Sequence, residues 1–259
     1  MRLILGILLL FSIKAQALTG TEIAQKVYNS NREADSFQKT KMTLIDKSKS
    51  KRERVFIVIA KDNNKYDSQS LIAFSAPKSI KRTGLLIHNH KGSDADQWLY
   101  LPALKKTRRI ASAKKQGRFV GSDLSYEDLE DRPVSKDNHE LIGEKVIGGQ
   151  KYYLIKSTPK DPSDSMYRKI EYFVDPNRWT IKKADFYTEK EKVYKTLLVK
   201  DFKKVGKTWI AEHTTIKNLE LGHTTVLEVI ETKFNNNFNP TYFQKGALEN
   251  PGILMKYLK

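Results

Sequence analysis

The chain has 259 residues, no cysteine and a formal net charge of +17. The lack of cysteine excludes disulfides, thiolate metal sites, a cysteine nucleophile and the lipid-modified cysteine of bacterial lipoproteins. The positive charge favours anionic partners, although lysines scattered along a whole chain are equally typical of an ordinary solvated surface.

The first 17 residues have the pattern of a secretory signal peptide. Arg2 precedes an apolar run, 3–13, and Ala15-Gln16-Ala17 fits a signal peptidase site. The run is too short to cross a bilayer core of about 30 Å, so an uncleaved anchor is the weaker interpretation. We expect cleavage after Ala17 and one soluble domain, residues 18–259, in the periplasm. Export also makes nucleic acid a poor partner.

A helix is predicted at the start of this domain. Thr19 and Glu22 have the spacing of a capping box, and Ile23 and Val27 repeat at helical spacing. We expect the helix to end near Asn31.

Strand patterns follow. Residues 37–46 alternate between two faces, and later runs that are denser in apolar residues indicate strands covered on both sides: 54–62, 69–77, 83–92 and 96–102. Two hairpins turn at Gly148-Gly149 and at residues 175–177, and three further strands occupy residues 192–234.

About ten or eleven meandering strands with few helices predict a mainly β fold with one large antiparallel sheet. Such a sheet must curl or close to protect its edges. We therefore expect an incomplete, half-open β-barrel with a few covering helices.

Residues 116–133 (QGRFVGSDLSYEDLEDRP) differ from the strands around them. Gly117 and Gly121 interrupt the segment, and Ser125 with Asp128 predicts a capped helical turn. We expect an irregular loop with one or two short helices. Together with the first helix, this loop can cover the concave face of the sheet and leave an apolar groove of lipid size.

A basic cluster follows the strand that ends at Pro102. It consists of Lys105, Lys106, Arg108 and Arg109. One interpretation is docking to phospholipid headgroups or to an acidic rim on a partner protein. The plainer interpretation is an edge strand that cations protect from aggregation.

Two stretches carry a family resemblance: residues 96–110 (DQWLYLPALKKTRRI) and 117–129 (GRFVGSDLSYEDL). With the strands around them, they resemble the periplasmic outer-membrane lipoprotein-sorting proteins, the LolA-like group. The similarity is greatest to the branch found alongside exporters of the resistance-nodulation-division type.

The resemblance implies a half-open barrel with a helical lid, an apolar cavity for acyl chains, and neither catalysis nor a cofactor. It implies as partners an inner-membrane transporter, an outer-membrane acceptor and a transient membrane contact, for a protein that we expect to be a monomer. Carriers of this group use an arginine of the lid-contacting sheet for release. The sequence does not assign that part to Arg52, to Arg54 or to another position.

The candidate lipid-binding residues are apolar positions of the predicted strands. Alternation places Trp98 and Tyr100 on one face of the strand and Leu99 and Leu101 on the other. One pair should therefore face the groove, and the other should pack against the lid or against residues outside the sheet. Ordinary core is the alternative for each residue. The full set of candidates is Met42, Leu44, Phe56, Val58, Leu86, Trp98, Leu99, Tyr100 and Leu101.

The sequence contains no recognised catalytic motif. His88, His90, Asp94 and Asp96 form too loose a set to predict a metal site. The carboxylates of residues 123–131 are expected to cap turns or to pair with Arg108, Arg109 and Arg132 rather than to perform acid–base chemistry.

The leading hypothesis is a non-enzymatic periplasmic carrier that binds acyl chains of lipoproteins or lipids and transfers them towards the outer membrane. The alternative is an accessory subunit that binds and regulates an inner-membrane exporter without carrying lipid. A concave face that is apolar throughout favours carriage, whereas charge pairs across it favour an interaction module. A hydrolase acting on an amphiphile would need a convergent polar cluster that the sequence does not supply.

Overall fold

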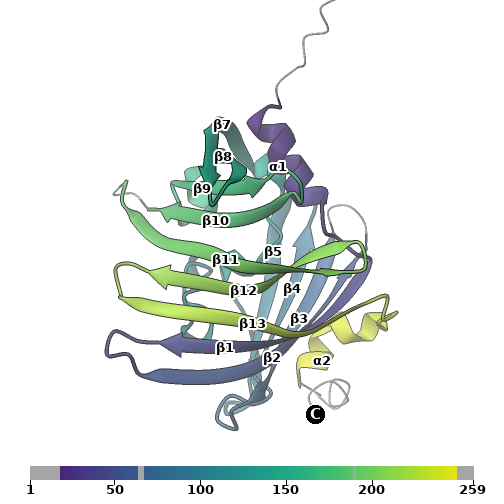
Figure 1. Cartoon of the computed structure of the whole chain (residues 1–259). Coiled ribbons are helices and arrows are strands. Elements are labelled where there is room, and N and C mark those ends of the chain that lie inside the picture. The colour runs from purple at the N-terminus through teal and green to yellow at the C-terminus, as the bar shows by residue number, and fades with distance from the viewer. Residues whose placement is uncertain (1–17, 64–66, 189–190, 250–259) are drawn as a thin grey trace, which may run out of the picture.

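The structure is a computed structural model that describes residues 18–63, 67–188 and 191–249, so the predicted signal peptide lies outside the described residues. One antiparallel sheet of 13 strands dominates it, against the ten or so expected (Figure 1). The strands are β1 (Asp35–Ile45), β2 (Lys51–Asp62), β3 (Ser68–Ala76), β4 (Gly84–His90), β5 (Ser93–Leu101), β6 (Lys106–Arg109), β7 (Asp137–Ile147), β8 (Gln150–Pro159), β9 (Lys169–Asp175), β10 (Thr180–Tyr187), β11 (Val193–Val205), β12 (Thr208–Asn218) and β13 (His223–Phe234).

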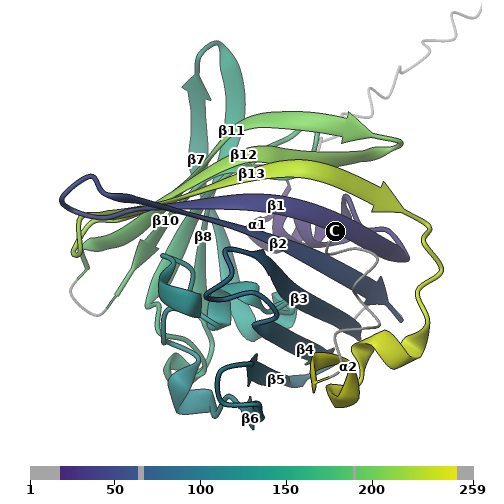
Figure 2. The same ribbon diagram turned by 90° about the horizontal axis from the view of Figure 1, so that it is seen from below.

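Strands adjacent in sequence pair with each other except β6 and β7, and β1 also pairs with β13, which joins the two halves of the chain. The strands β6 and β7 form the two edges of the sheet, which curls without closing (Figures 1 and 2). The predicted half-open β-barrel with few covering helices is therefore confirmed. Among the described residues, neither α-helix has the length and apolar character needed to cross a membrane.

The first helix, α1 (Gly20–Asn29), begins at the predicted capping box. The backbone N–H of Glu22 donates to Thr19 Oγ1 (3.2 Å), and the N–H of Thr19 donates to Glu22 Oε2 (2.7 Å). The fully buried Ile23 packs against Ile155 and Val174. The helix therefore lies across the inner face of β8 and β9.

Strands β2 to β5 are covered on both faces, which explains their dense apolar sequences. On the outer face they pack against the C-terminal segment, η6 (Pro240–Phe243) and α2 (Lys245–Glu249), whose Phe243 and Leu248 are buried (Figure 2). Asp35 holds the start of this segment by accepting hydrogen bonds from the backbone N–H groups of Asn236 (2.6 Å) and Asn237 (2.7 Å).

Residues 116–133, hereafter the lid segment, lie inside the curl of the sheet (Figure 2). They contain two short 3₁₀ turns, η2 (Phe119–Gly121) and η3 (Glu127–Leu129). The predicted capped turn is present, because Ser125 N–H donates to Asp128 Oδ2 (2.6 Å) and Asp128 N–H donates to Ser125 Oγ (3.2 Å). Phe119 is buried among inner-face residues of β1 to β5.

Candidate functional site

A cavity of about 460 Å³ lies between the lid segment and the inner face of β8 to β12. Its volume is in the range of small-molecule sites, which are about 300–1,000 Å³ and mostly apolar. Apolar side chains make up much of its wall: Leu124, Tyr167, Ile170, Tyr172, Ile181, Ala184, Phe186, Leu197, Val199, Ala211 and Ile216.

Strand register explains how one row of these side chains forms the floor of the cavity. Ala184 pairs with Leu197, and Leu197 pairs with Ile216, across three neighbouring strands. On its other side Ala184 pairs with Tyr172. Because a strand sends alternate side chains to opposite faces, Leu197 faces inward while Leu198 is 46% exposed on the outer face. The small Ala184 leaves space between its larger neighbours.

A smaller cavity of about 150 Å³ adjoins the first one beneath α1. Val27 of the helix lines it together with Ile155 and Val174 of the sheet. The two cavities share five wall residues: Arg132, Asp137, Ser157, Tyr172 and Ile181. The boundary between the two cavities is therefore mixed, since Tyr172 and Ile181 share it with the polar Arg132, Asp137 and Ser157.

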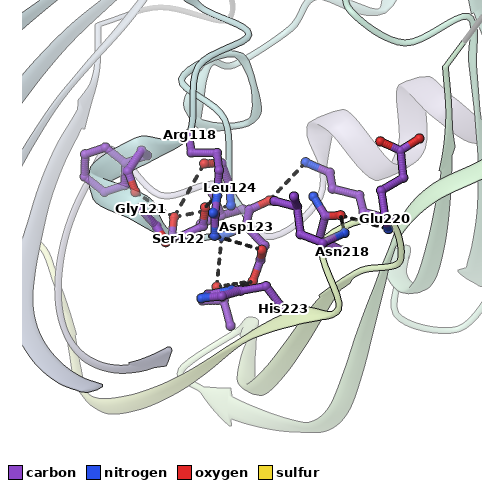
Figure 3. Close-up of polar contacts among 12 residues, drawn as sticks. Arg118, Gly121, Ser122, Asp123, Leu124, Asn218, Glu220 and His223 are labelled. Atoms are coloured by element: carbon purple, nitrogen blue, oxygen red, sulfur yellow. Dashed lines mark hydrogen bonds and ion pairs between the residues drawn. The ribbon is translucent and has the colours of Figure 1, made fainter. Parts of the chain in front are cut away.

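Asp123 attaches the lid segment to β13 (Figure 3). Its carboxylate is fully enclosed and accepts hydrogen bonds from His223 Nδ1 (2.7 Å), Thr225 Oγ1 (2.7 Å) and a guanidinium nitrogen of Arg118 (3.2 Å). Its backbone oxygen also accepts from the buried Lys195 Nζ (3.4 Å). Buried carboxylates are costly unless they are paired in this way, so the contact fixes this part of the lid segment to the sheet.

A second attachment joins Asp128 to Lys195 of β11. The two form an ion pair in which both side chains are almost entirely buried, at 2% exposure for Lys195 and 8% for Asp128. The hydroxyl of Tyr167 donates to Asp128 Oδ1 (2.9 Å), and burial raises the pKa of this phenol well above its ordinary value. The Lys195 ammonium also lies 4.7 Å from the ring centroid of Phe186. Both Lys195 and Asp128 line the cavity, as do the paired Arg132 and Asp137, so its wall carries two ion pairs.

Arg54 of β2 is a sheet arginine that contacts the lid segment. Its guanidinium donates to the backbone oxygen of Val120, a residue in the left-handed region with φ 47°. Burial lowers the pKa of Arg54. The sequence left open whether Arg52 or Arg54 occupies such a position, and the structure places Arg52 among exposed residues.

The predicted partners of the lid carboxylates were wrong. Arg109 pairs with Asp96, and Arg132 pairs with Asp137 (2.7 Å). The lid carboxylates bind other cations instead, in the pairs Asp123–Arg118, Asp128–Lys195, Glu130–Lys115 and Asp131–Arg32. Arg118 and Lys115 belong to the lid segment or directly precede it, whereas Lys195 and Arg32 come from distant parts of the chain, which sequence proximity does not reveal.

The histidines considered for metal binding have other contacts. His88 Nε2 lies 2.7 Å from the backbone oxygen of Phe243, and His90 Nε2 lies 3.1 Å from Asp96 Oδ2. Within the described ranges, no group of three or more histidine or carboxylate side chains is arranged to hold a metal ion.

The nine candidate lipid-binding residues divide between the two faces. The inner-face cluster against the lid segment contains Met42, Leu44, Phe56, Val58 and Leu99. The outer-face cluster under the C-terminal segment contains Leu86, Trp98 and Tyr100. The expected separation of Trp98 and Tyr100 from Leu99 is therefore confirmed.

The cavity of about 460 Å³ is lined instead by residues of β8 to β12 that sequence reasoning did not single out. Leu101 is half-buried, and Val58 lines a separate cavity of about 390 Å³ on the β1–β3 side of the lid segment. The candidate docking residues Lys105, Lys106, Arg108 and Arg109 are all exposed.

Comparisons with known proteins give the same class as the fold. A family model described as an uncharacterized protein matches residues 66–250. A Vibrio parahaemolyticus domain described as an outer membrane lipoprotein-sorting protein domain is 28% identical with a TM-score of 0.84, over 89% of this chain and 98% of that one. A DUF1329 family protein from Desulfovibrio piger is 26% identical with a TM-score of 0.85, over 88% and 97% of the two chains.

A LolA superfamily protein from Nitrosomonas europaea shares the fold at 21% identity, with a TM-score of 0.69 over 89% of this chain and 99% of that one. A search of curated proteins gave no match. The half-open barrel with an internal lid thus defines a protein of the lipoprotein-sorting class. The chain belongs to the family whose model matches residues 66–250, and it shares the fold of the lipoprotein-sorting and LolA superfamily structures.

Proposed function

We propose that the protein is a non-enzymatic periplasmic carrier that holds acyl chains of a lipoprotein or lipid in the cavity beneath the lid segment. Transfer towards the outer membrane is the direction that the lipoprotein-sorting relatives favour. The observation that carries the proposal is the row formed by Tyr172, Ala184, Leu197 and Ile216, which gives the cavity an apolar floor across four strands.

Hydrocarbon transfer explains why such a floor suits a carrier. Each methylene removed from water contributes about 0.8 kcal/mol, so a long acyl chain leaves its membrane only at a cost of roughly 10 kcal/mol or more. A protein groove that offers a similar apolar environment offsets most of this cost. This function needs no nucleophile or cofactor, in keeping with the lipoprotein-sorting class of the relatives.

The lid segment gives this carrier a way to shield its cargo. Its polar anchors lie at the seam with the sheet, at Asp123 against β13 and at Asp128 against β11, while the floor between them is apolar. An acyl chain longer than the cavity would separate the lid segment from the sheet along this seam.

The buried pair Lys195–Asp128 is the observation that favours the alternative function. A charge pair at the cavity wall also holds the lid segment in place. A permanently closed lid segment suits an accessory subunit that binds an exporter without carrying lipid. The two functions differ in whether the cavity ever contains lipid.

Native mass spectrometry of the protein purified from a periplasmic extract, followed by solvent extraction, tests the proposal. The carrier function predicts a co-purifying phospholipid, lipoprotein or other acylated molecule with the mass of its adduct. An unliganded mass that persists after incubation with inner-membrane lipid would contradict carriage and support the exporter subunit.

A further inference from the structure

Several turns lie at one end of the sheet because antiparallel neighbours reverse direction. Residue pairing places the β1–β2 turn (46–50), the β3–β4 turn (77–83) and the β5–β6 turn (102–105) at this end. The β12–β13 turn (219–222) lies beside the first of them, with Lys47 Cγ 3.6 Å from the position of a Cβ on Gly222. In Figure 2 the β1–β2 hairpin projects from the body of the protein.

These turns and the strand ends next to them carry a concentration of exposed cations, hereafter the basic end. In the described part of the chain, no ion pair involves any of them. They are Lys47, Lys49, Lys51, Arg52, Lys78, Lys81, Arg82, Lys105, Lys106 and Arg108.

Two carboxylates near these turns have partners of their own, while Glu220 lies exposed on the β12–β13 turn. Asp46 accepts hydrogen bonds from Ser48 Oγ (2.6 Å) and from the N–H of Ser50 (3.0 Å), and Glu53 pairs with Lys41 (2.7 Å). The opposite end is different, since Arg32 there binds both Asp62 and Asp131. Positive charge is therefore concentrated at the end where, among the described residues, the exposed cations form no ion pair.

The backbone also places a cation where glycine would be easier to accommodate. Lys49 (φ 69°), Arg82 (φ 73°) and Lys105 (φ 46°) occupy the left-handed region in three different turns. Glycine is the usual residue for this conformation. Each turn thus keeps a long cationic side chain in spite of its backbone geometry.

Large apolar side chains are exposed on the same turns. Leu104 is 51% exposed beside Lys105, and Leu219 and Leu221 are 52% and 48% exposed on the β12–β13 turn. Apolar tips within a field of cations fit the boundary between headgroups and acyl chains of a bilayer. A nucleic acid would engage the cations but would leave the leucines without partners.

We propose that the basic end is a membrane-docking surface that binds bilayers with anionic headgroups. The cations attract the headgroup layer, and Leu104, Leu219 and Leu221 enter it. The inference goes beyond the carrier function and does not depend on it, because the docking residues do not line the acyl-chain cavity of about 460 Å³.

Vesicle co-sedimentation tests this surface with the purified protein. The vesicles contain phosphatidylglycerol and phosphatidylethanolamine in one series and phosphatidylcholine alone in another. The test variant combines Lys51→Glu, Lys81→Glu and Lys106→Glu, one change at each basic turn. The control combines Lys200→Glu, Lys203→Glu and Lys207→Glu, exposed lysines of the β11–β12 hairpin that give the same change in net charge.

We expect the wild type to bind the anionic vesicles, more weakly at high salt, and to bind phosphatidylcholine poorly. Three lost contacts predict an affinity about a hundredfold lower for the test variant, since each cation near an anionic surface contributes roughly fivefold. The control variant should keep most of its binding, and Leu104→Ser with Leu221→Ser should weaken binding at unchanged net charge.

Two results would overturn the proposal. One is an equal loss in the test and control variants, which would assign binding to net charge alone. The other is absence of wild-type binding to the anionic vesicles, which would leave an acidic protein as the partner of these turns. Circular dichroism of each variant separates loss of docking from loss of folding.

Discussion

Lys195 and Asp128 lie 67 positions apart in the sequence and form a nearly fully buried ion pair between β11 and the lid segment. The ammonium is also placed against the rings of Tyr167 and Phe186. This pair and the Asp123 contacts with β13 join the lid segment to the inner face of the sheet, at the wall of the apolar cavity. The stability of these contacts therefore affects both the folding of the protein and the access of a ligand to the cavity.

Removing one member of the pair should destabilise the protein strongly. Asp128→Asn leaves a buried ammonium without its counter-charge, for which we expect a loss of about 3–5 kcal/mol in the free energy of unfolding. Lys195→Met in the Asp128→Asn background should restore part of that loss, because no unpaired charge remains. Urea unfolding of the two single variants and the double variant measures the coupling. Additive losses would show that the two side chains do not interact.

Filling the cavity should block acyl-chain binding without altering the outer surface. Leu197→Trp projects a larger side chain over Ala184, whereas Leu198→Trp places the same side chain on the outer face of the same strand. We expect titration with a fluorescent long-chain fatty acid to show at least tenfold weaker binding for Leu197→Trp. Wild-type affinity is expected for Leu198→Trp. Equal affinities in both variants would place the acyl site elsewhere.

Trp98 is expected to matter for stability rather than for cargo. It is 9% exposed in the outer-face cluster, beneath the C-terminal segment, with Lys245 Nζ 4.6 Å from its ring centroid. Trp98→Ala should reduce the free energy of unfolding by about 3–5 kcal/mol, as large-to-small changes in a core do. The same fatty-acid titration should give unchanged affinity below the unfolding transition. A selective loss of binding with wild-type stability would mean that Trp98 contacts the cargo.

Glu127 should make stability depend on pH. Burial raises the pKa of its carboxyl above the ordinary value of 4.5, so the folded state holds this proton more tightly than the unfolded state does. Stability contributed by the protonated form is present below the unfolded pKa and is lost as pH rises through the raised value. Relative to wild type, Glu127→Gln should therefore become more stable as pH increases from about 4 to about 8. A difference that stays constant with pH, in unfolding curves measured across this range, would contradict the raised pKa.

Local patterns in the sequence were sufficient to predict the curled antiparallel sheet. Side-chain alternation separated Trp98 from Leu99, and the spacings of Thr19 with Glu22 and of Ser125 with Asp128 identified two caps. Each depends on residues within a few positions of one another. Alternation could not decide which pair faced inward, because both faces of β5 are covered.

The cavity depended on long-range pairing that no local pattern contains. Lys195 lies on the same face of β11 as Leu197 and Val199. From the local sequence alone, a lysine at this position is expected to face solvent. Its inward position follows from a carboxylate 67 residues away. Likewise, nothing near the C-terminal segment in the sequence indicated that Phe243 and Leu248 cover the outer face of β2 to β5. These contacts shifted the candidate acyl site from β5 to the row through Ala184.

Photo-crosslinking with a diazirine-labelled fatty acid, followed by peptide mapping, tests the acyl-chain cavity most directly. The carrier function predicts labelled peptides from β9 to β12 and from the lid segment, with labelling that unlabelled fatty acid displaces and that Leu197→Trp reduces. Labelling confined to the outer face around Trp98, or labelling that unlabelled fatty acid does not displace, would contradict an acyl site beneath the lid segment.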